Sequence, residues 1–430
     1  MIGSLGQILV GVVDSLMVGQ LGDVPLAAIS YANSLLAIPL VFGIGVAYGL
    51  TPLVANADAQ GKTRKAARLF KNGMVVNTVV GILIVGILFA LRPFMDQFDQ
   101  DPAVVLEAIP YFTVVTLSFF PLQIFFNYKQ FTEGLSDTKA AMRLSLASNV
   151  LNIILNWIFI FGKFGIEPMG MVGAAYATLI SRIVMMALMI WWVHSKARYK
   201  EHMTIFWDTK LKWDEMRAVL AIGVPSGLQY IFEVGAFAAS SLIIGSIDYI
   251  EQAAHQIAIS LASISYMAAS GFGAAATVRV GNQLGRKDYK TLKVAATTLF
   301  EMVVLFMAAA GVVYLVGRDF LPGLFTEEIE VIQIAATLLI VTTLFQISDG
   351  VQVTALGALR GLSDVRMPTI ITFVSYWVIS IPLGYILGKE LEMGAMGVWI
   401  GLAVGLTLSA LAQWWRFTSK VNQMIKSSTS

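Results

Sequence analysis

Four carboxylic acids lie inside long apolar stretches of the 430-residue sequence: Asp14, Glu233, Glu301 and Asp349. A charged aspartate at the centre of a lipid bilayer costs about 2.5–3.5 kcal/mol on insertion scales, so an acid in such a place calls for a functional explanation. Asp14, Glu233 and Asp349 each lack a basic partner in their own predicted helix. A carboxylate without a fixed cationic partner can exchange one, whether a sodium ion, a proton or the cationic head of an organic molecule. We therefore expect these three acids to have a role in function.

Glu301 receives a different interpretation. It lies within about two turns of the basic segment that contains Lys287, Lys290 and Lys293. Its side chain can therefore reach the inner membrane interface, and it could also pair with Arg182, the one basic residue inside a predicted helix. For Glu301 we expect a structural role.

Composition identifies the elements that must hold these acids. The chain is 57% hydrophobic and 13% charged, with a mean hydropathy of +0.75, whereas soluble domains carry roughly a quarter charged residues. A helix of about 20 apolar residues crosses the hydrocarbon core of a bilayer. We predict an all-α integral membrane protein with twelve transmembrane helices, near 3–22, 30–55, 72–92, 108–128, 141–161, 170–193, 218–246, 253–278, 294–317, 331–356, 367–388 and 394–415.

The basic residues alternate between the two sides of this arrangement. Of the 29 lysines and arginines, 24 fall in loops on one side or in the C-terminal tail, and four fall in loops on the other side. Because basic residues accumulate on the cytoplasmic side of short loops, this asymmetry predicts that both termini are cytoplasmic. No cleavable signal peptide is visible, and we expect the usual start of such a first helix to lie some residues upstream.

An internal repeat divides the chain. The sequence GLSD at 134–137 recurs at 361–364, an offset of 227, and Gly19 with AA at 27–28 recurs as Gly245 with AA at 253–254, an offset of 226. Two registers that agree to one residue indicate two halves of six helices each. Because six is even, both halves enter the membrane from the same side, which is a parallel repeat. We predict an N-terminal lobe at 1–193, a linker at 194–217, a C-terminal lobe at 218–416 and a tail at 417–430, with the two lobes around a central cavity.

The acids do not follow the repeat. At these offsets Asp14 aligns with Ser240, Glu233 with Gln7 and Asp349 with Leu122. We therefore expect the acids of the two halves to have different roles in function.

Other chemistries find little support in the sequence. The segment GKT at 61–63 lacks the first glycine of a P-loop, because position 56 is asparagine. The chain has no cysteine, and its three histidines have no metal-ligand spacing. We therefore expect no enzymatic activity and no cofactor, and we expect transport to be driven by an ion gradient. An intramembrane enzyme or a lipid flippase is the alternative class, but the clustered acid and histidine set usual for these is not visible.

Over essentially its whole length the sequence resembles the multidrug and toxic compound extrusion (MATE) family, specifically its NorM-like branch. The resemblance depends on several motifs taken together: VVDSLMVG at 12–19, FEVGAF at 232–237, AAHQ at 253–256, SDGVQ at 348–352 and ALRG at 358–361.

The resemblance implies export of organic cations and aromatic drugs in exchange for Na⁺ or H⁺. It implies a cation site at Glu233 and Asp349, with the helical aromatic Tyr266, and these acids would be the Na⁺ ligands if sodium is the coupling ion. Tyr266 could equally serve packing between helices. The alternative function is an exporter or flippase of an endogenous metabolite or lipid-linked precursor on a similar two-lobe fold.

In the N-terminal lobe the resemblance implies a substrate or proton site at Asp14. Polar residues that match this site are Asn152, Asn156 and Thr178, and residues that match the drug cavity are Gln7 and Gln256. A membrane Asn, Gln or Thr is as often a hydrogen-bonding contact between helices as a ligand, so both interpretations stay open. The resemblance also implies a bacterial inner (plasma) membrane protein whose partners are lipid and small drugs, with no nucleic acid, and we expect a monomer.

Overall fold

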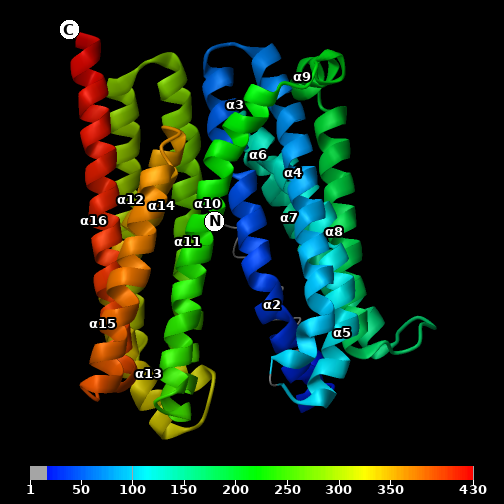
Figure 1. Ribbon diagram of the computed structural model, residues 1–430, viewed down its shortest axis with the longest axis vertical. Helices are drawn as coiled ribbons and strands as arrows, with labels where there is room; N and C mark the ends of the chain where they lie inside the picture. The colour runs from blue at the N-terminus through cyan, green and yellow to red at the C-terminus, as the bar shows by residue number, and fades with distance from the viewer. Residues whose placement is uncertain (1–16, 99, 430) are drawn as a thin grey trace. The chain divides into compact units, whose positions relative to one another are not determined.

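A computed structural model describes residues 17–98 and 100–429 of the chain, and this part is helical with no β-strand. The helices in chain order are α2 (Asp23–Ala47), α3 (Leu50–Ala59), α4 (Thr63–Leu91), η1 (Arg92–Gln97), α5 (Pro102–Leu117), α6 (Phe119–Gly134), α7 (Lys139–Phe161), α8 (Gly170–Ser195), α9 (Ala197–Asp208), α10 (Trp213–Gly245), α11 (Tyr249–Arg286), α12 (Tyr289–Gly317), η2 (Pro322–Leu324), α13 (Ile329–Gly361), α14 (Arg366–Phe373), η3 (Val374–Ser380), α15 (Ile381–Tyr385), η4 (Ile386–Glu390) and α16 (Gly394–Thr429) (Figure 1).

Eleven helical stretches in the described residues are long and apolar enough to cross a membrane. They correspond to the predicted spans from 30–55 to 394–415, and the predicted span 3–22 lies mostly outside the described residues. The all-α membrane fold is thus confirmed. Two predicted spans are less regular than expected: the second bends between α2 and α3 at Tyr48–Gly49, and the eleventh contains two π-helical segments, η3 and η4.

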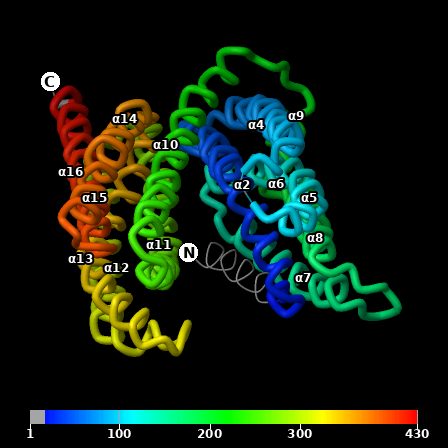
Figure 2. The backbone as a smooth tube through the Cα atoms, turned by 60° about the horizontal axis from the view of Figure 1, so that its bottom comes forward, coloured from blue at the N-terminus to red at the C-terminus, as the bar shows by residue number. Residues whose placement is uncertain are grey.

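Internal contacts divide the chain into two units, one ending at Gly227 and the other beginning at Leu228. The division falls inside the long helix α10. Figure 2 looks more nearly along the helices and shows α11 to α16 gathered as one bundle and α4 to α8 as another. Each bundle has its own apolar interior, because long helices that are apolar on several faces must bury them against one another.

Within the first unit, glycines let the end of α2 approach the start of α10. A Cβ atom placed on Gly45 would overlap the backbone of Gly227, and one placed on Gly49 would overlap the backbone at Val219 and Gly223. Small residues at such spacing allow helix backbones to touch in a membrane protein. The first part of α10 is therefore fixed to the first unit.

The sequence repeat reappears as a repeated turn after α6 and after α13. Ser136 and Ser363 both have positive φ, 60° and 58°. In each turn the serine N–H donates to the carbonyl three residues back at 2.8 Å, and the following aspartate N–H donates to the carbonyl five residues back, at 2.8 Å for Asp137 and 2.9 Å for Asp364. The same four residues thus build the same helix end in both halves.

Helix contacts beside these turns repeat as well. Gly134 faces the Val54 side chain, whose Cβ lies 2.8 Å from an idealised Cβ on the glycine. Gly361 faces Val280 at the same 2.8 Å, and Val54 and Val280 are themselves related by the 226 offset. The repeat predicted from short sequence matches is therefore a repeat of three-dimensional contacts.

The segment between the two halves is folded onto α4. The Lys212 N–H donates to the Asn72 side chain at 2.9 Å, and Lys71 Nζ donates to the Thr209 carbonyl at 2.6 Å. Glu215 forms an ion pair of 2.6 Å with Arg68. These contacts order the connection through α9 into α10.

A cluster of charges anchors the loop after α13 to α16. Arg416 donates two hydrogen bonds to the Asp364 carboxylate at 2.8 and 3.1 Å, and Lys420 Nζ lies 2.8 Å from the same group. Burial alone would raise the pKa of Asp364, but the hydrogen bonds and charges of Arg416 and Lys420 hold this pKa below its ordinary value. The ionised form is therefore the one that stabilises the fold.

The contact between α11 and α13 gives a first prediction. A methyl group at Gly357 would overlap the Gly273 carbonyl, and because both sides are helix backbone neither can move aside. We expect Gly357→Ala to destabilise the protein by about 1–3 kcal/mol and to lower the Tm of purified protein in detergent. Gly86→Ala is the control: Gly86 is helical with nothing within 4 Å of an added Cβ. An unchanged Tm for Gly357→Ala would contradict this contact.

The charge cluster gives a second prediction. Asp364→Asn should lower the free energy of unfolding by about 2 kcal/mol, because hydrogen bonds to charged groups are lost. Since the folded pKa is lowered, this contribution is fully present above the unfolded value near 3.8 and is lost as the pH falls through the folded value. The Tm difference between wild type and variant should stay constant from about pH 5 to pH 8 and shrink below about pH 4. Asp319→Asn, at an exposed pair 3.7 Å apart, should change little at any pH.

Candidate functional site

Three helices of the second unit bring together the predicted cation-site residues. Glu233 comes from α10, Tyr266 from α11 and Asp349 from α13. All three line one cavity of about 240 Å³, whose other described lining residues are Val234, Phe237, Ile259, Ala262, Ser263, Met267 and Phe345. We refer to this space as the C-terminal cavity.

The two carboxylates of the C-terminal cavity are removed from water. Glu233 is 5% exposed and Asp349 is 6% exposed, and their surroundings are mostly hydrocarbon. The Tyr266 hydroxyl is hydrogen-bonded to Glu233, and the charges of Glu233 and Asp349 act on each other. Two like charges in apolar surroundings repel strongly, since little solvent screens them.

A buried arginine lies on the helix that carries Asp349. The helix with Asp349 continues to Gly361, past the predicted end at 356, and so includes Arg360. Arg360 is 5% exposed. Arg360 therefore shares a helix with Asp349, because α13 is about one turn longer than its apolar block suggested, but no described ion pair or hydrogen bond joins the two side chains.

The π-helical segment η3 supports the cavity from one side. The Trp377 indole N–H donates to the Phe232 carbonyl at 3.0 Å, beside Glu233, and the Trp377 ring lies against Gly235. Tyr376, fully buried, shares hydrogen bonds of 3.2 and 3.3 Å with the Gln352 side chain. Segments of π-helix are frequent at functional sites. Here the π-helical turn places Trp377 against α10 and the adjacent Tyr376 against α13.

These features suit one exchangeable positive charge. Two carboxylates and a phenolic hydroxyl offer oxygen ligands to a small cation, and the apolar wall accepts the rings of an organic one. Among the described residues there is no group of three or more His, Cys, Asp or Glu that could hold a metal ion as a resident cofactor.

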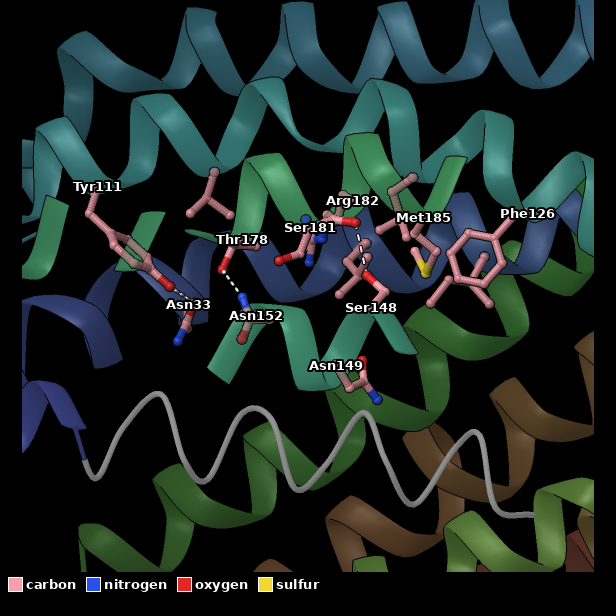
Figure 3. Close-up of a pocket in the computed structure, with 14 residues that line it drawn as sticks. Asn33, Tyr111, Phe126, Ser148, Asn149, Asn152, Thr178, Ser181, Arg182 and Met185 are labelled. Carbon is pink, nitrogen blue, oxygen red and sulfur yellow. Dashed lines mark hydrogen bonds between the residues drawn. The ribbon is translucent and has the colours of Figure 1, made fainter. Parts of the chain in front are cut away.

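The first unit contains a second cavity, of about 280 Å³, between α2, α5, α6, α7 and α8 (Figure 3). Two predicted residues line this N-terminal cavity: Asn152 Nδ2 donates to Thr178 Oγ1 at 3.5 Å. Asn156 lies one turn further along α7, fully buried, and donates to Asn152 Oδ1 at 3.3 Å. Asn152 and Thr178 thus line the cavity, and Asn156 is hydrogen-bonded to Asn152.

Arg182 gives the N-terminal cavity a positive charge. Its Nη1 donates to Ser118 Oγ at 2.6 Å, and the guanidinium lies over the Phe119 ring at 5.6 Å from the centroid. Among the fourteen described lining residues Arg182 is the one with a formal charge.

The remaining predicted residues have different outcomes. Asp14 and Gln7 lie outside the described residues. Gln256 is exposed on α11 and does not belong to the described lining of either cavity. Glu301 is exposed on α12 and does not belong to the described lining of either cavity, and its structural role stays a prediction.

Sequence reasoning missed several residues of the N-terminal cavity. Asn33, Asn149 and Ser181 line it, and no motif pointed to them. One signal was available for Asn149, because Asn149 and Asn152 are three residues apart and so share a helix face. A second signal was Arg182, which is a basic residue inside a predicted span.

Comparisons with known proteins agree with this architecture. The sequence profile of the MatE family matches residues 1–158 and 225–386. The chain is 33% identical to the multidrug resistance protein NorM of Vibrio parahaemolyticus over 416 residues, covering 96% of this chain and 91% of that protein. It is also 33% identical to the multidrug resistance protein MdtK of Yersinia pseudotuberculosis over 423 residues, covering 95% and 91% respectively.

Solved structures show the same fold. One is the outward-facing conformation of a multidrug resistance MATE family transporter, with a TM-score of 0.91 and 21% identity over 99% of this chain and 94% of that chain. Another is the eukaryotic MATE transporter AtDTX14, with a TM-score of 0.88 and 22% identity over 99% and 95%. The family resemblance and the expectation of a transporter rather than an enzyme are confirmed. A profile match over more than half of the chain, with relatives a third identical along nearly its whole length, shows that this protein is a member of the MatE family of membrane transporters.

Proposed function

We propose that this protein is a cation-coupled multidrug efflux antiporter, which exports organic cations and aromatic drugs in exchange for Na⁺ or H⁺. The observation that carries the proposal is the pair of buried carboxylates, Glu233 and Asp349, in an otherwise apolar cavity with the Tyr266 hydroxyl. The relatives NorM and MdtK are named as multidrug resistance proteins, which supports drugs as the cargo.

The proposed mechanism is competition for one desolvated negative charge. An empty, ionised pair is unfavourable in apolar surroundings, so either the coupling ion or a cationic drug must neutralise it. Binding of the ion lowers the affinity for the drug, and the reverse holds to the same degree, because coupling between two ligands is reciprocal. An ion gradient can therefore drive release of the drug on one side.

The proposal also covers the membrane location, the orientation and the lobes of the protein. We place the protein as a monomer in a bacterial inner membrane with both termini in the cytoplasm, with lobes at 1–193 and 218–416, a linker at 194–217 and a tail at 417–430. The positive charge of the loops on one side supports this orientation. In the first lobe we assign Asp14 as a second substrate or proton site with Asn152, Asn156 and Thr178, with Gln7 and Gln256 toward the drug.

Efflux from vesicles tests the coupling. Purified protein is reconstituted into liposomes loaded with ethidium, and efflux is followed with a Na⁺ gradient at equal pH, then with a pH gradient at equal Na⁺. We expect one of the two gradients to accelerate efflux, and an ionophore that collapses that gradient to abolish the acceleration. Protein-free liposomes give the leak rate. No acceleration by either gradient would contradict antiport.

Substitution of single acids tests the site. Glu233→Gln and Asp349→Asn remove one negative charge each while keeping size. A charge-assisted contact contributes about 1.5–3 kcal/mol, so we expect coupled efflux to fall by about 10- to 100-fold. Glu301→Gln is the matched control, since Glu301 is an exposed acid of the same unit, and it should transport like wild type. Full activity of Glu233→Gln would disprove the site assignment while leaving the antiport result intact.

A further inference from the structure

The second unit carries an excess of positive charge in the loops predicted to be cytoplasmic. Its segments 279–293, 360–366 and 416–430 hold ten lysines and arginines and two acids. In the first unit the loops on the same predicted side hold fourteen basic residues and seven acids. These loops are 56–71, 129–143 and 196–217. A surface dominated by one sign of charge attracts partners of the opposite sign, and the second unit presents such a surface.

Both acids of these segments already have partners within the fold. Asp364 forms the ion pairs with Arg416 and Lys420 described above. Asp288 caps the start of α12, where its carboxylate accepts a hydrogen bond from the Thr291 N–H at 3.0 Å. Neither acid is therefore available to neutralise the remaining lysines and arginines as a group.

Four of these remaining residues lie at the turn between α11 and α12, and we call them the basic patch: Arg286, Lys287, Lys290 and Lys293. All four side chains are exposed, and none of them belongs to an ion pair among the described residues. Asp288 lies among them and offsets one of the four charges. Like charges within eight residues repel one another, and a negatively charged ligand relieves that repulsion.

The end of α16 fixes the basic patch in place. Lys293 Nζ donates to the Asn422 side chain at 3.0 Å, and the ring of Phe417 packs against Phe300 at 5.9 Å between centroids. Phe417 belongs to the same apolar cluster as Leu292, next to the patch. Figure 1 shows the last turns of α16 at the same end of the unit as the turn between α11 and α12. A ligand therefore meets charges on packed helices, which lowers the entropic cost of binding.

The side chains next to the basic patch suit the boundary of a bilayer. On α12, Val294 directly follows Lys293 and is exposed, as is Leu305 further along the helix. On α16, Trp415 is exposed, and tryptophan is enriched where membrane meets water. Glu301, an exposed acid on α12, lies eight residues beyond Lys293, about 12 Å along the helix and too far for an ion pair. The patch thus lies at the level of lipid headgroups.

We propose that the basic patch is a binding site for the phosphate groups of anionic phospholipids, such as phosphatidylglycerol, in the adjacent leaflet. Lysine and arginine near a membrane surface attract anionic lipids, and their hydrogen bonds to phosphate are charge-assisted. The exposed apolar surface of α12 accommodates acyl chains, which a soluble anion lacks. The cytoplasmic identity of this leaflet rests on the proposed orientation, whereas the site itself does not depend on antiport.

Lipid titration of the purified full-length protein in detergent tests the site. Native mass spectrometry measures the apparent Kd of the first bound lipid, for dioleoylphosphatidylglycerol and for dioleoylphosphatidylcholine. We expect wild type to bind the anionic lipid at least about fivefold more tightly. Because each basic residue near an anionic headgroup contributes about fivefold, the triple variant Lys287→Gln, Lys290→Gln, Lys293→Gln should weaken phosphatidylglycerol binding by at least about tenfold. Its binding of phosphatidylcholine should change by less than about threefold.

A matched control separates the site from net charge. The triple variant Lys200→Gln, Lys210→Gln, Lys212→Gln removes the same charge from exposed lysines of the first unit, and it should weaken binding of the anionic lipid by less than about threefold. Equal losses in both triple variants, or displacement of the lipid by an excess of inorganic phosphate or of a DNA oligonucleotide, would overturn the proposal.

A single substitution keeps the test decisive if the triple variant fails to fold. Lys290→Glu reverses one charge of the basic patch and should weaken phosphatidylglycerol binding by about tenfold or more, because attraction is lost and repulsion is added. An unchanged affinity of this variant would also contradict the site. Since the protein is in detergent without any ion gradient, these results are independent of the vesicle test of antiport.

Discussion

An ionised carboxylate in hydrocarbon is stable only while a positive charge lies next to it, and much of this structure serves that condition. Glu233 and Asp349 lie in one apolar cavity, so the second acid increases the cost of leaving the first without a cation. The Tyr266 hydroxyl is hydrogen-bonded to Glu233 in the same cavity. The α11–α13 contact, close enough to require Gly273 and Gly357, fixes the distance between the helices that carry the tyrosine and the aspartate. A looser contact would admit water and weaken the dependence on a bound ion.

Duplication followed by divergence explains how the two halves relate. The turns at Ser136 and Ser363 and the glycine–valine contacts beside them are the same in both, because they determine how helices end and touch. The cavity walls are free of that requirement and differ in charge. The described lining of one cavity thus contains Glu233 and Asp349, and that of the other contains Arg182.

The sequence predicted the helical membrane fold and the repeat because both depend on long-range averages of composition and on short exact matches. The family resemblance implied a shared site for Glu233, Tyr266 and Asp349, and these residues line one cavity. The sequence could not predict the end of α13, because an arginine after an apolar block usually indicates that the membrane helix has ended. It also could not predict the π-helical turns, because no amino-acid composition is typical of them. Gln256 fits a family motif but is exposed on α11, and which face of a uniformly apolar helix turns inward depends on its neighbours. The inward position of Ser181 on α8 could not be predicted for the same reason.

The hydrogen bond between Trp377 and the Phe232 carbonyl places an indole ring one residue away from Glu233, an acid of the proposed cation site. Indole emission shifts with the electric field across the ring and with local hydration. If a cation binds at the carboxylate pair as proposed, we expect its binding to change the emission of Trp377. In a chain without cysteine, a single introduced thiol elsewhere can carry an acceptor dye, so that ion occupancy and helix displacement become readable in the same molecule.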